Sequence, residues 1–145
     1  MKVSKYMSPK VISARADEGV RTVFFRMRRE RIRHMPVVDG GKNLIGWISD
    51  RDLRRPEWAD PEVDLSYHYN LDDEVTVGDL MNPNPTAVHT FDTMHKAVGL
   101  FREHRWGALP VLDKTETLVG VLSQVDCLTA LSEVLDELHA AKKAR

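Results

Sequence analysis

The chain has 145 residues, of which 42% are hydrophobic and 30% charged, and its formal net charge at pH 7 is −1. This size and composition fit one compact domain or two intertwined half-domains, and they argue against disorder. No apolar run approaches the ~18 residues that a membrane span requires. The single cysteine, Cys127, excludes an internal disulfide and fits a reducing compartment. We therefore expect a globular protein of the cytoplasm.

Charge is divided unevenly along the chain. Residues 1–55 hold 14 basic and 6 acidic side chains, whereas residues 56–145 hold 7 basic and 16 acidic ones. Such polarity has three readings, which the sequence leaves open. The basic part could bind an anionic partner, the two parts could attract each other within one chain or across a dimer, or the faces could simply be solvated.

An internal repeat organises the sequence. Residues 3–53 align without a gap on residues 77–127, and 12 of the 51 positions are identical. The identical pairs are Val3/Val77, Met7/Met81, Pro9/Pro83, Arg28/Arg102, Arg31/Arg105, Pro36/Pro110, Val37/Val111, Asp39/Asp113, Leu44/Leu118, Gly46/Gly120, Ser49/Ser123 and Asp52/Asp126. Each copy is too short to bury a good core alone, so we expect the copies to pack on each other.

Both copies predict the same elements in the same order. A short extended stretch at 11–13 or 86–88 comes first, and a helix follows because apolar residues recur at i, i+3, i+4 and i+7. Asp17 and Asp92 stand where N-caps are expected. The residues that mark the helix faces are Val20, Val23, Phe24, Met27 and Arg31 in copy one, and Met94, Ala97, Val98, Phe101 and Arg105 in copy two.

Two apolar runs then flank a turn at 39–42 or 114–116, which is typical of a β-hairpin. A Ser-x-x-Asp sequence begins the final helix, which is short in copy one, where Pro56 ends it, and long in copy two. We therefore predict an α/β fold of two β-α-β-β-α units. The predicted segments are unit one at 3–55, an acidic linker at 56–76, unit two at 77–130 and an amphipathic helix at 131–145 that suits a dimer or a partner protein.

A Met-x-Pro start, the strand Met35-Pro36-Val37-Val38-Asp39 or Ala108-Leu109-Pro110-Val111-Leu112-Asp113, and a closing Gly-x-x-Ser-x-x-Asp occur in both copies. Together they resemble the CBS domain, and two copies in tandem resemble a CBS pair, or Bateman module. The resemblance implies two units related by a pseudo-twofold axis, with sheets packed together and helices outside. It also implies a regulatory, sensory module that needs no cofactor and often forms a homodimer. Its clefts between the units would bind an adenosine-containing ligand, AMP-like in the first place, with ADP, ATP, NAD and S-adenosylmethionine as candidates.

The two Ser-x-x-Asp sequences have two readings. A Ser followed three residues later by an acid is a capping box, which needs no ligand. The same helix N-terminus suits a phosphate, and a carboxylate beside it can accept hydrogen bonds from ribose hydroxyls. The resemblance favours ligand binding in at least one copy, with the Asp on the ribose.

The resemblance also implies that the residues before the second strand, with the first strand, clamp the adenine and the phosphates. Arg33 and His34 of copy one suit a phosphate, whereas Gly107 and Ala108 of copy two, next to Trp106, suit packing. We therefore expect the phosphate-facing site in copy one. The candidate ligand-binding residues are Val11, Ile12, Ser13, Arg33, His34, Met35, Pro36, Ser49, Asp52, Thr86, Ala87, Gly107, Ala108, Leu109, Pro110, Ser123 and Asp126.

Other functions compete with this interpretation. One is a scaffold with empty clefts that dimerises and binds another protein, and the exposed apolar side chains expected at Phe24, Phe25, Leu100 and Phe101 favour a homodimer. Another is RNA or DNA binding through an arginine run, although Glu30 interrupts it and no aromatic side chains alternate with it. The arginines concerned are Arg26, Arg28, Arg29, Arg31, Arg33, Arg51, Arg54 and Arg55.

Residues 56–76 are expected to cover a cleft as an acidic lid, which would repel a polyphosphate and favour AMP over ATP. Enzyme chemistry has little support, because the chain has no Gly-x-Ser-x-Gly elbow and no phosphate-binding glycine loop. No histidine pair has the i, i+4 spacing of a helical zinc site. We expect no catalytic residue and no metal site.

Overall fold

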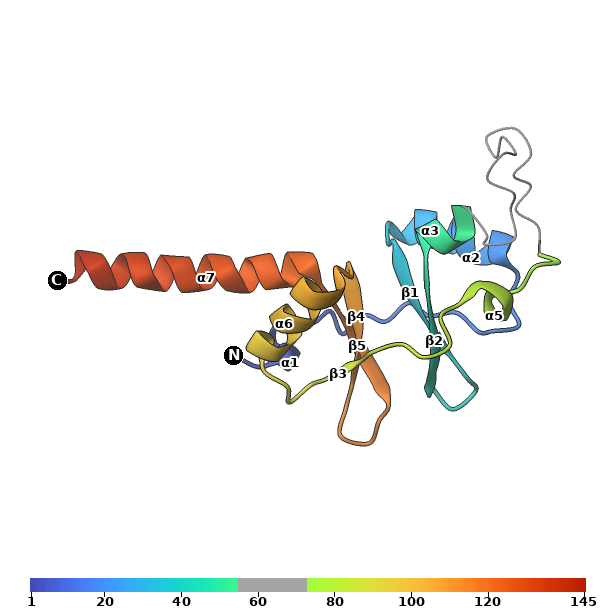
Figure 1. Cartoon of the computed structure of the whole chain (residues 1–145), viewed down its shortest axis with the longest axis horizontal. Coiled ribbons are helices and arrows are strands. Elements are labelled where there is room, and N and C mark those ends of the chain that lie inside the picture. The colour runs from blue at the N-terminus through green and yellow to red at the C-terminus, as the bar shows by residue number, and fades with distance from the viewer. Residues whose placement is uncertain (55–72) are drawn as a thin grey trace. The chain divides into compact units, whose positions relative to one another are not determined.

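The computed structural model describes residues 1–54 and 73–145. They form two compact units (Figure 1). The continuous unit is Ile12–Pro85, and the split unit combines Met1–Val11 with Thr86–Arg145. Each unit mixes helices and strands, as predicted for the α/β class.

The continuous unit is built on a two-stranded antiparallel sheet. Its elements are α2 (Val20–Glu30), β1 (His34–Val38), β2 (Leu44–Ser49), α3 (Asp50–Arg54) and α5 (Val77–Leu80). Single bridges extend the sheet at both edges, where Ala14 pairs parallel with Val37 and Asn82 pairs antiparallel with Trp47. The expected extended stretch at 11–13 therefore makes its sheet contact one residue later, at Ala14. The core contains Val20, Val23, Met27, Met35, Val37, Ile48, Leu53 and Val77, each at most 3% exposed.

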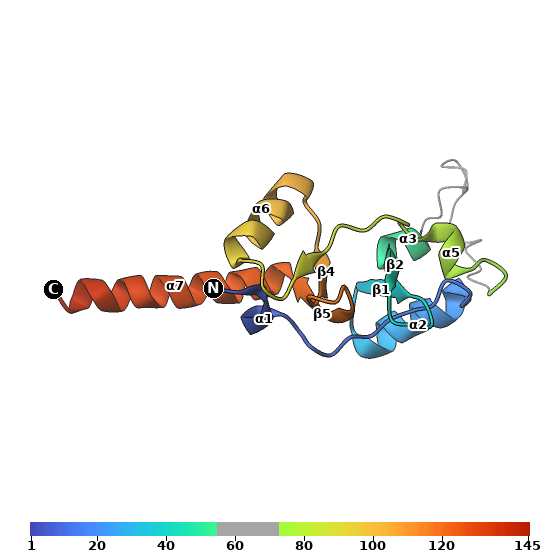
Figure 2. The same ribbon diagram turned by 90° about the horizontal axis from the view of Figure 1, so that it is seen from below.

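The split unit has a three-stranded sheet in the order β3-β4-β5. Its elements are α1 (Val3–Tyr6), β3 (Val88–His89), α6 (Met94–His104), β4 (Ala108–Leu112), β5 (Leu118–Ser123) and α7 (Gln124–Lys143). Strand β3 is parallel to β4, β5 is antiparallel to β4, and Ser8 forms a bridge with Val121 at the β5 edge. Figure 2 shows α7 extending beyond the other elements of this unit.

Both hairpins are confirmed, and they share one turn geometry. The carboxylate of Asp39 accepts hydrogen bonds from the backbone N–H groups of Gly41 and Asn43, at 2.9 and 3.0 Å. Asp113 does the same for Thr115 and Thr117. Both strand pairs also carry a register shift at the equivalent place, between Val37 and Val38 and between Val111 and Leu112.

The expected N-caps Asp17 and Asp92 are wrong. Helix α2 begins at Val20 with Gly19 as its N-cap, and the carboxylate of Asp73 accepts a hydrogen bond from the Thr22 N–H at 3.0 Å. A Cβ on Gly19 would lie 2.1 Å from the Asp73 Oδ1 atom, so only glycine leaves room for this remote acceptor.

Helix α6 has Thr93 as its N-cap, whose hydroxyl accepts from the Lys96 N–H at 3.1 Å. Asp92 lies one residue before the cap. Its carboxylate instead accepts a hydrogen bond from the His89 N–H at 2.8 Å and one from the Lys96 ammonium at 3.1 Å.

Each compact unit includes the Met-x-Pro segment of the other sequence copy. Met7 of copy one lies in the split unit against Gly120, and Met81 of copy two lies in the continuous unit against Gly46. A Cβ on Gly46 would be 2.3 Å from the Met81 sulfur, and one on Gly120 would be 2.7 Å from the Met7 sulfur. The glycine of the closing motif and the methionine of the opening motif are therefore partners across the repeat. The folded units and the sequence copies 3–55 and 77–130 divide the chain differently.

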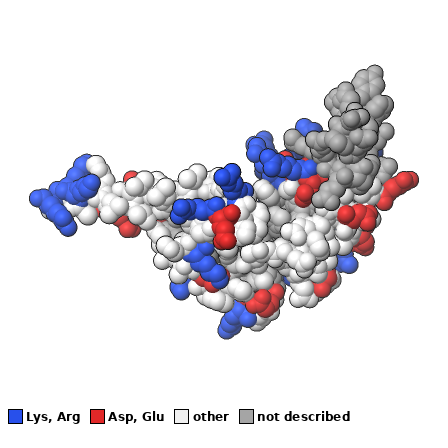
Figure 3. All heavy atoms as spheres, in the orientation of Figure 1, with Lys and Arg blue, Asp and Glu red and all other residues white. Residues whose placement is uncertain are grey.

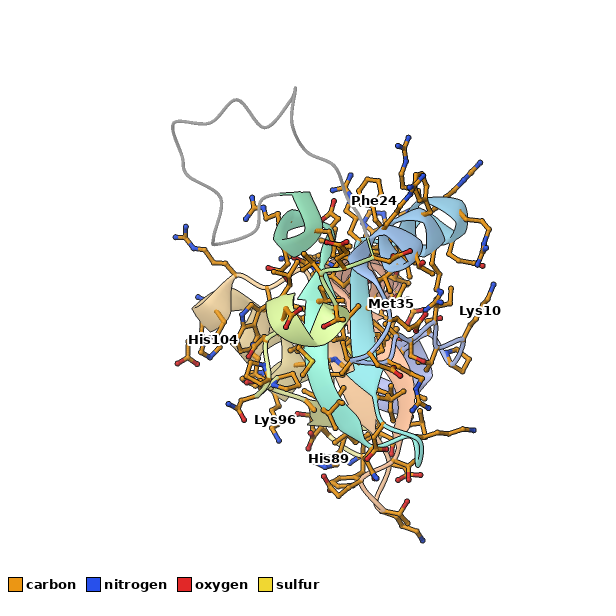
Figure 4. The ribbon with its side chains drawn as sticks, turned by 90° about the vertical axis from the view of Figure 1, so that its right-hand side faces the viewer. Lys10, Phe24, Met35, His89, Lys96 and His104 are labelled. Atoms are coloured by element: carbon orange, nitrogen blue, oxygen red, sulfur yellow. The ribbon has the colours of Figure 1, made fainter. Side chains whose placement is uncertain are left out.

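The expected excess of exposed apolar residues on the first helix of each copy is only partly present. Phe25 on α2 is 53% exposed, but Phe101 on α6 is 7% exposed and belongs to the core of the split unit. Phe24 and Leu100 are half-buried, and Figure 4 shows Phe24 on α2 and the buried Met35 on β1. The larger exposed apolar surface lies on α7.

Among the residues that the structure describes, none of the helices is both long and apolar enough to cross a membrane. The same residues contain no group of three or more His, Cys, Asp or Glu that could hold a metal ion.

Candidate ligand-binding site

In the continuous unit, the hairpin brings most of the predicted residues of copy one to one end of its sheet. His34 and Ser49 are partners in the β1–β2 register, and the Asp50 N–H donates to the Arg33 carbonyl at 2.9 Å. This bond fixes the start of α3 against the residue that precedes β1. Arg33, His34, Ser49 and Asp52 therefore lie together.

The Ser49-x-x-Asp52 sequence forms a capping box. The Asp52 Oδ2 atom accepts from the Ser49 N–H at 2.8 Å and from its hydroxyl at 3.1 Å, and the Asp52 N–H donates to the Ser49 Oγ at 3.3 Å. All of these carboxylate contacts use Oδ2. Within the described part of the chain, Oδ1 has no hydrogen-bond partner, so forming the cap leaves one carboxylate oxygen available to a ligand.

His34 is partly buried beside Trp47 and two carboxylates. Its ring stacks on Trp47 with centroids 5.8 Å apart and an interplanar angle of 25°. Burial lowers the pKa of the imidazole, while the carboxylates of Asp50 and Asp52 partly oppose that shift. A neutral ring is a hydrogen-bond donor and acceptor, and an approaching phosphate would favour its protonation.

The extended segment at residues 13–14, which pairs with the edge of β1, is held in place by an ion pair. The Arg26 guanidinium donates to the Ser13 carbonyl at 3.0 Å and to the Glu18 carboxylate at 2.9 Å. Ala14, next in the chain, donates its N–H to the Pro36 carbonyl at 2.9 Å. The Arg26 guanidinium is thus bound to groups of the same unit. It is therefore not available to a nucleic-acid phosphate, as RNA or DNA binding through the arginine run would require.

The split unit repeats this arrangement with different side chains. The Gln124 N–H donates to the Gly107 carbonyl at 3.1 Å, the counterpart of the bond from Asp50 to Arg33. The Asp126 Oδ2 atom accepts from the Ser123 N–H at 2.7 Å, and the Ser123 Oγ accepts from the Asp126 N–H at 3.2 Å. The Asp126 Oδ1 atom also has no partner among the described residues.

The two sites differ in charge and size. The positions of Arg33 and His34 are occupied in the split unit by Gly107 and Ala108. Trp106, whose carbonyl accepts from the Gln124 side chain at 2.8 Å, stacks on His104 with ring centroids 4.0 Å apart and packs against the core of the split unit. The split unit therefore offers a small, uncharged surface where the continuous unit offers two nitrogen-bearing side chains.

Some predicted site residues have buried side chains. Met35 is 0% exposed and Leu109 is 2% exposed, and both belong to the hydrophobic cores. Pro36, Pro110 and Ala108 are also buried. A ligand could contact these five residues only through their backbone atoms. The remaining predicted residues are at least partly accessible: Val11, Ile12, Ser13, Arg33, His34, Ser49, Asp52, Thr86, Ala87, Gly107, Ser123 and Asp126.

Sequence reasoning missed Asp50, Gln124 and Trp47. Asp50 and Gln124 occupy the same repeat position, directly after the serine of the closing motif. The repeat alignment alone could have drawn attention to that position, because it pairs an acid with an amide directly after the serine of the Ser-x-x-Asp sequence. Trp47 carried no such signal, since its stacking depends on the hairpin register.

The predicted acidic lid at 56–76 lies mostly outside the described residues. Of its last part, Asp73 accepts from the Thr22 hydroxyl and N–H, and Thr76 forms a capping box with Asp79 at the start of α5. These contacts attach the end of the linker to the continuous unit.

Cys127 has the properties of a packed thiol. It is half-buried, and burial together with the nearby Asp126 charge raises the pKa of its thiol. A raised pKa leaves little thiolate at neutral pH, so this residue is a poor nucleophile.

The CBS domain family model matches residues 3–56 and 77–133 of this chain. A CBS domain-containing protein of Dictyostelium discoideum is 31% identical over 138 residues, which cover 92% of this chain and 93% of that protein. Other relatives are longer. The chain spans 52% of the chloroplastic CBS domain-containing protein CBSX1 of Arabidopsis thaliana, to which it is 29% identical over 122 residues, 72% of this chain.

Two solved structures illustrate the likeness of fold. CBSX2 in complex with AMP superposes with a TM-score of 0.77 at 23% identity, covering 92% of this chain and 97% of that chain. The CBS domain pair of protein MJ0100, in complex with 5′-methylthioadenosine and S-adenosyl-L-methionine, has a TM-score of 0.72 at 18% identity and covers 90% and 99%.

Proposed function

Because the chain belongs to the CBS domain family and carries two such domains in tandem, we propose that it is a regulatory module that reversibly binds an adenosine-containing ligand. The predicted family resemblance is thereby confirmed, and the ligand is our inference. CBSX2 with AMP and MJ0100 with two adenosine derivatives support an adenosine ligand in general. For this chain we favour an AMP-like ligand and no required cofactor.

The observation that carries the proposal is the oxygen of each capping carboxylate that the helix cap leaves unused and that has no partner among residues 1–54 and 73–145. Asp52 and Asp126 use only Oδ2 for the helix cap, which leaves Oδ1 to accept hydrogen bonds from ribose hydroxyls. The cap also fixes the carboxylate before the ligand arrives, so little side-chain entropy is lost on binding. The Asp of Ser-x-x-Asp can therefore cap the helix with one carboxylate oxygen and bind a ribose with the other.

We propose that the continuous unit contributes the stronger site. Arg33 is exposed and adjacent to His34, and together they would neutralise a phosphate. Asp50 and Asp52 lie close enough to act on the His34 charge. The carboxylates of Asp50 and Asp52 offset the positive charge that Arg33 and a protonated His34 bring to a phosphate, which disfavours a polyphosphate relative to a ligand with one phosphate.

The test is calorimetric titration of AMP into the full chain and two matched variants. Asp52→Asn keeps an oxygen acceptor for the Ser49 N–H but loses the charge that holds the ribose. We expect AMP to bind about ten- to a hundred-fold more weakly, because a hydrogen bond to a charged group is worth ~1.5–3 kcal/mol. Asp126→Asn makes the same change in the split unit and should weaken binding less.

Thermal unfolding of both variants controls for the fold, and we expect it to stay close to that of the wild type. Equal losses in the two variants would mean two equivalent sites. Unchanged AMP binding in both would reduce the Ser-x-x-Asp sequences to helix caps.

We further propose that the ligand-bound state is passed on to an effector protein and that the chain is a homodimer. Binding would shift the population of states that differ in ligand affinity. A scaffold that binds a partner protein without a ligand is the alternative, and it predicts no thermal stabilisation by AMP. Nucleic-acid binding ranks third, and it would show affinity that falls steeply with salt.

A further inference from the structure

Helix α7 carries a stripe of exposed leucines. Leu128, Leu131, Leu135 and Leu138 are 62, 51, 54 and 57% exposed, and their spacing of 3, 4 and 3 residues places them on one side of the helix. The opposite side attaches α7 to its own unit. Ala130, 5% exposed, packs in the core, and Glu133 accepts a hydrogen bond from the Tyr6 hydroxyl and one from Lys5.

The far half of α7 is exposed to solvent. Every residue from Leu135 to Arg145 is exposed, and in Figures 1 and 2 this half projects past the other elements of the split unit. Isolated helices of this length are marginal in water, and most helical stability comes from packing an apolar face. The leucine stripe therefore suits a partner that covers it.

A groove lies beside the near half of the same stripe. It measures about 280 Å³ and is lined by Val98, Phe101, Arg102, Gln124, Cys127 and Leu128. Its lining is mostly apolar, and the guanidinium of Arg102 is its one positively charged group. An occupant should therefore bring an apolar side chain with a negative charge next to it.

We propose that α7 of a second copy of this chain covers the stripe in antiparallel orientation. With a twofold axis that crosses the stripe at the level of residue 133, Leu131 meets the second copy's Leu135, and Leu128 meets its Leu138. This is the a-to-d′ pairing of an antiparallel coiled coil. Each Leu138 then enters the other copy's groove, and the adjacent Glu137 comes near Arg102. This α7 pairing rests on the homodimer proposed above and identifies the leucine stripe and the groove as its interface.

Charge favours this orientation over a parallel one. Gln124 and Lys142 continue the stripe at either end, four residues before Leu128 and four after Leu138. In a parallel pair the two Lys142 ammonium groups would face each other, whereas in the antiparallel pair each faces Gln124. Figure 3 shows the basic far end of α7 beyond a largely uncharged helix surface. The positions that flank the stripe also hold no Lys, Arg, Asp or Glu: they are Cys127, Val134 and Ala141 on one side, and Val125, Ser132 and His139 on the other.

The first experiment is sedimentation velocity of the full chain at tens of micromolar. We expect the wild type at about twice 16.6 kDa and the Leu135→Asp variant at the monomer mass. Ala140→Asp is the matched control, because it adds the same charge to the same exposed part of α7 on the opposite side. It should sediment as the wild type does. Circular dichroism should show equal helix content in both variants.

A dimer that persists in Leu135→Asp would overturn the α7 pairing while leaving the homodimer and its AMP binding intact. A wild-type monomer at these concentrations would overturn both the pairing and the homodimer. AMP titration of the same samples keeps the ligand proposal separate, since neither Leu135 nor Ala140 is a candidate ligand residue.

Disulfide trapping tests the orientation. In a Cys127→Ser background, chains with Leu128→Cys and chains with Leu138→Cys are oxidised separately and as a mixture, one chain carrying a mass tag. The antiparallel pair predicts a disulfide-linked heterodimer in the mixture and little linkage in either chain alone. Linkage within each separate sample, without a heterodimer preference in the mixture, would overturn the antiparallel arrangement.

Discussion

His34 combines partial burial with two neighbouring carboxylates at the start of β1. Burial lowers the pKa of its imidazole in the folded protein, and Asp50 and Asp52 do not fully offset the shift. The folded state then binds fewer protons than the unfolded state, where the pKa is about 6.5. Stability contributed in this way is present above the unfolded-state pKa and is lost as the pH falls toward the folded-state value.

We expect the unfolding temperature of the wild type to fall between pH ~7.5 and ~5.5, the interval around the ordinary histidine pKa. The fall should be smaller in His34→Gln, which cannot take up the proton. Differential scanning fluorimetry across this interval measures both. His95→Gln, which changes an exposed histidine on α6, should keep the wild-type profile, and an identical profile in His34→Gln would contradict the prediction.

At the residue scale, the sequence predicted contacts that are local and missed those that are not. The Ser-x-x-Asp caps were predicted because donor and acceptor are three residues apart. The acceptor at the start of α2 is Asp73, which meets Thr22 across 51 residues, and no local pattern encodes such a pair. The choice of Asp17 as cap failed for this reason.

The sequence predicted well those elements whose signal lies within the element itself, as a regular spacing of apolar residues or a turn sequence. The amphipathic helices α2 and α6 and both hairpins follow from spacing and turn residues that lie within each element. The first strands were harder, because β3 is two residues long and its counterpart in copy one is the single bridge of Ala14. Such short edge strands are defined by their partners, so their extent is visible only in the folded unit.

Gly120 tests how tightly the Met7–Ser8 segment of copy one packs on β5 in the split unit. An added Cβ would lie 2.9 Å from the Ser8 carbonyl oxygen and 2.7 Å from the Met7 sulfur. Because the backbone oxygen cannot move away as a side chain can, we expect Gly120→Ala to destabilise the protein by about 1–3 kcal/mol. Chemical denaturation gives the free energy of unfolding.

Gly99→Ala is the control for this prediction. Gly99 lies in α6 with no atom within 4 Å of an added Cβ. Alanine should stabilise the helix by up to ~1 kcal/mol, since it has the higher helix propensity. If Gly120→Ala had the stability of the wild type, the Met7–Ser8 segment would pack loosely on β5.

On the scale of the whole molecule, the two folded units cut across the sequence repeat. The core of the continuous unit includes Val77, 0% exposed, which belongs to copy two by sequence. We therefore expect a fragment of residues 12–85 to retain more native helix and a sharper thermal transition than a fragment of residues 1–55. The shorter fragment lacks α5, so the core residues that pack against Val77 become exposed to solvent.

Circular dichroism of the two fragments makes the comparison. The variant Val77→Asp in the 12–85 fragment should abolish its transition, which ties the structure to this contact. If residues 1–55 folded as well as residues 12–85, the contribution of α5 to the core would be negligible.

The split unit also sets an order of events during synthesis on the ribosome. All of the continuous unit has been translated once residue 85 is added, and domains generally fold as they emerge. Residues 1–11 leave the ribosome before the continuous unit does, yet the Ser8 N–H donates to the Val121 carbonyl and the Val3 N–H to the Asp92 carbonyl. This segment is therefore made before the continuous unit but buried after it. Until residues 92–121 have been translated, the core side chains of Val3 and Tyr6 have no partners to pack against and stay exposed to water and to chaperones.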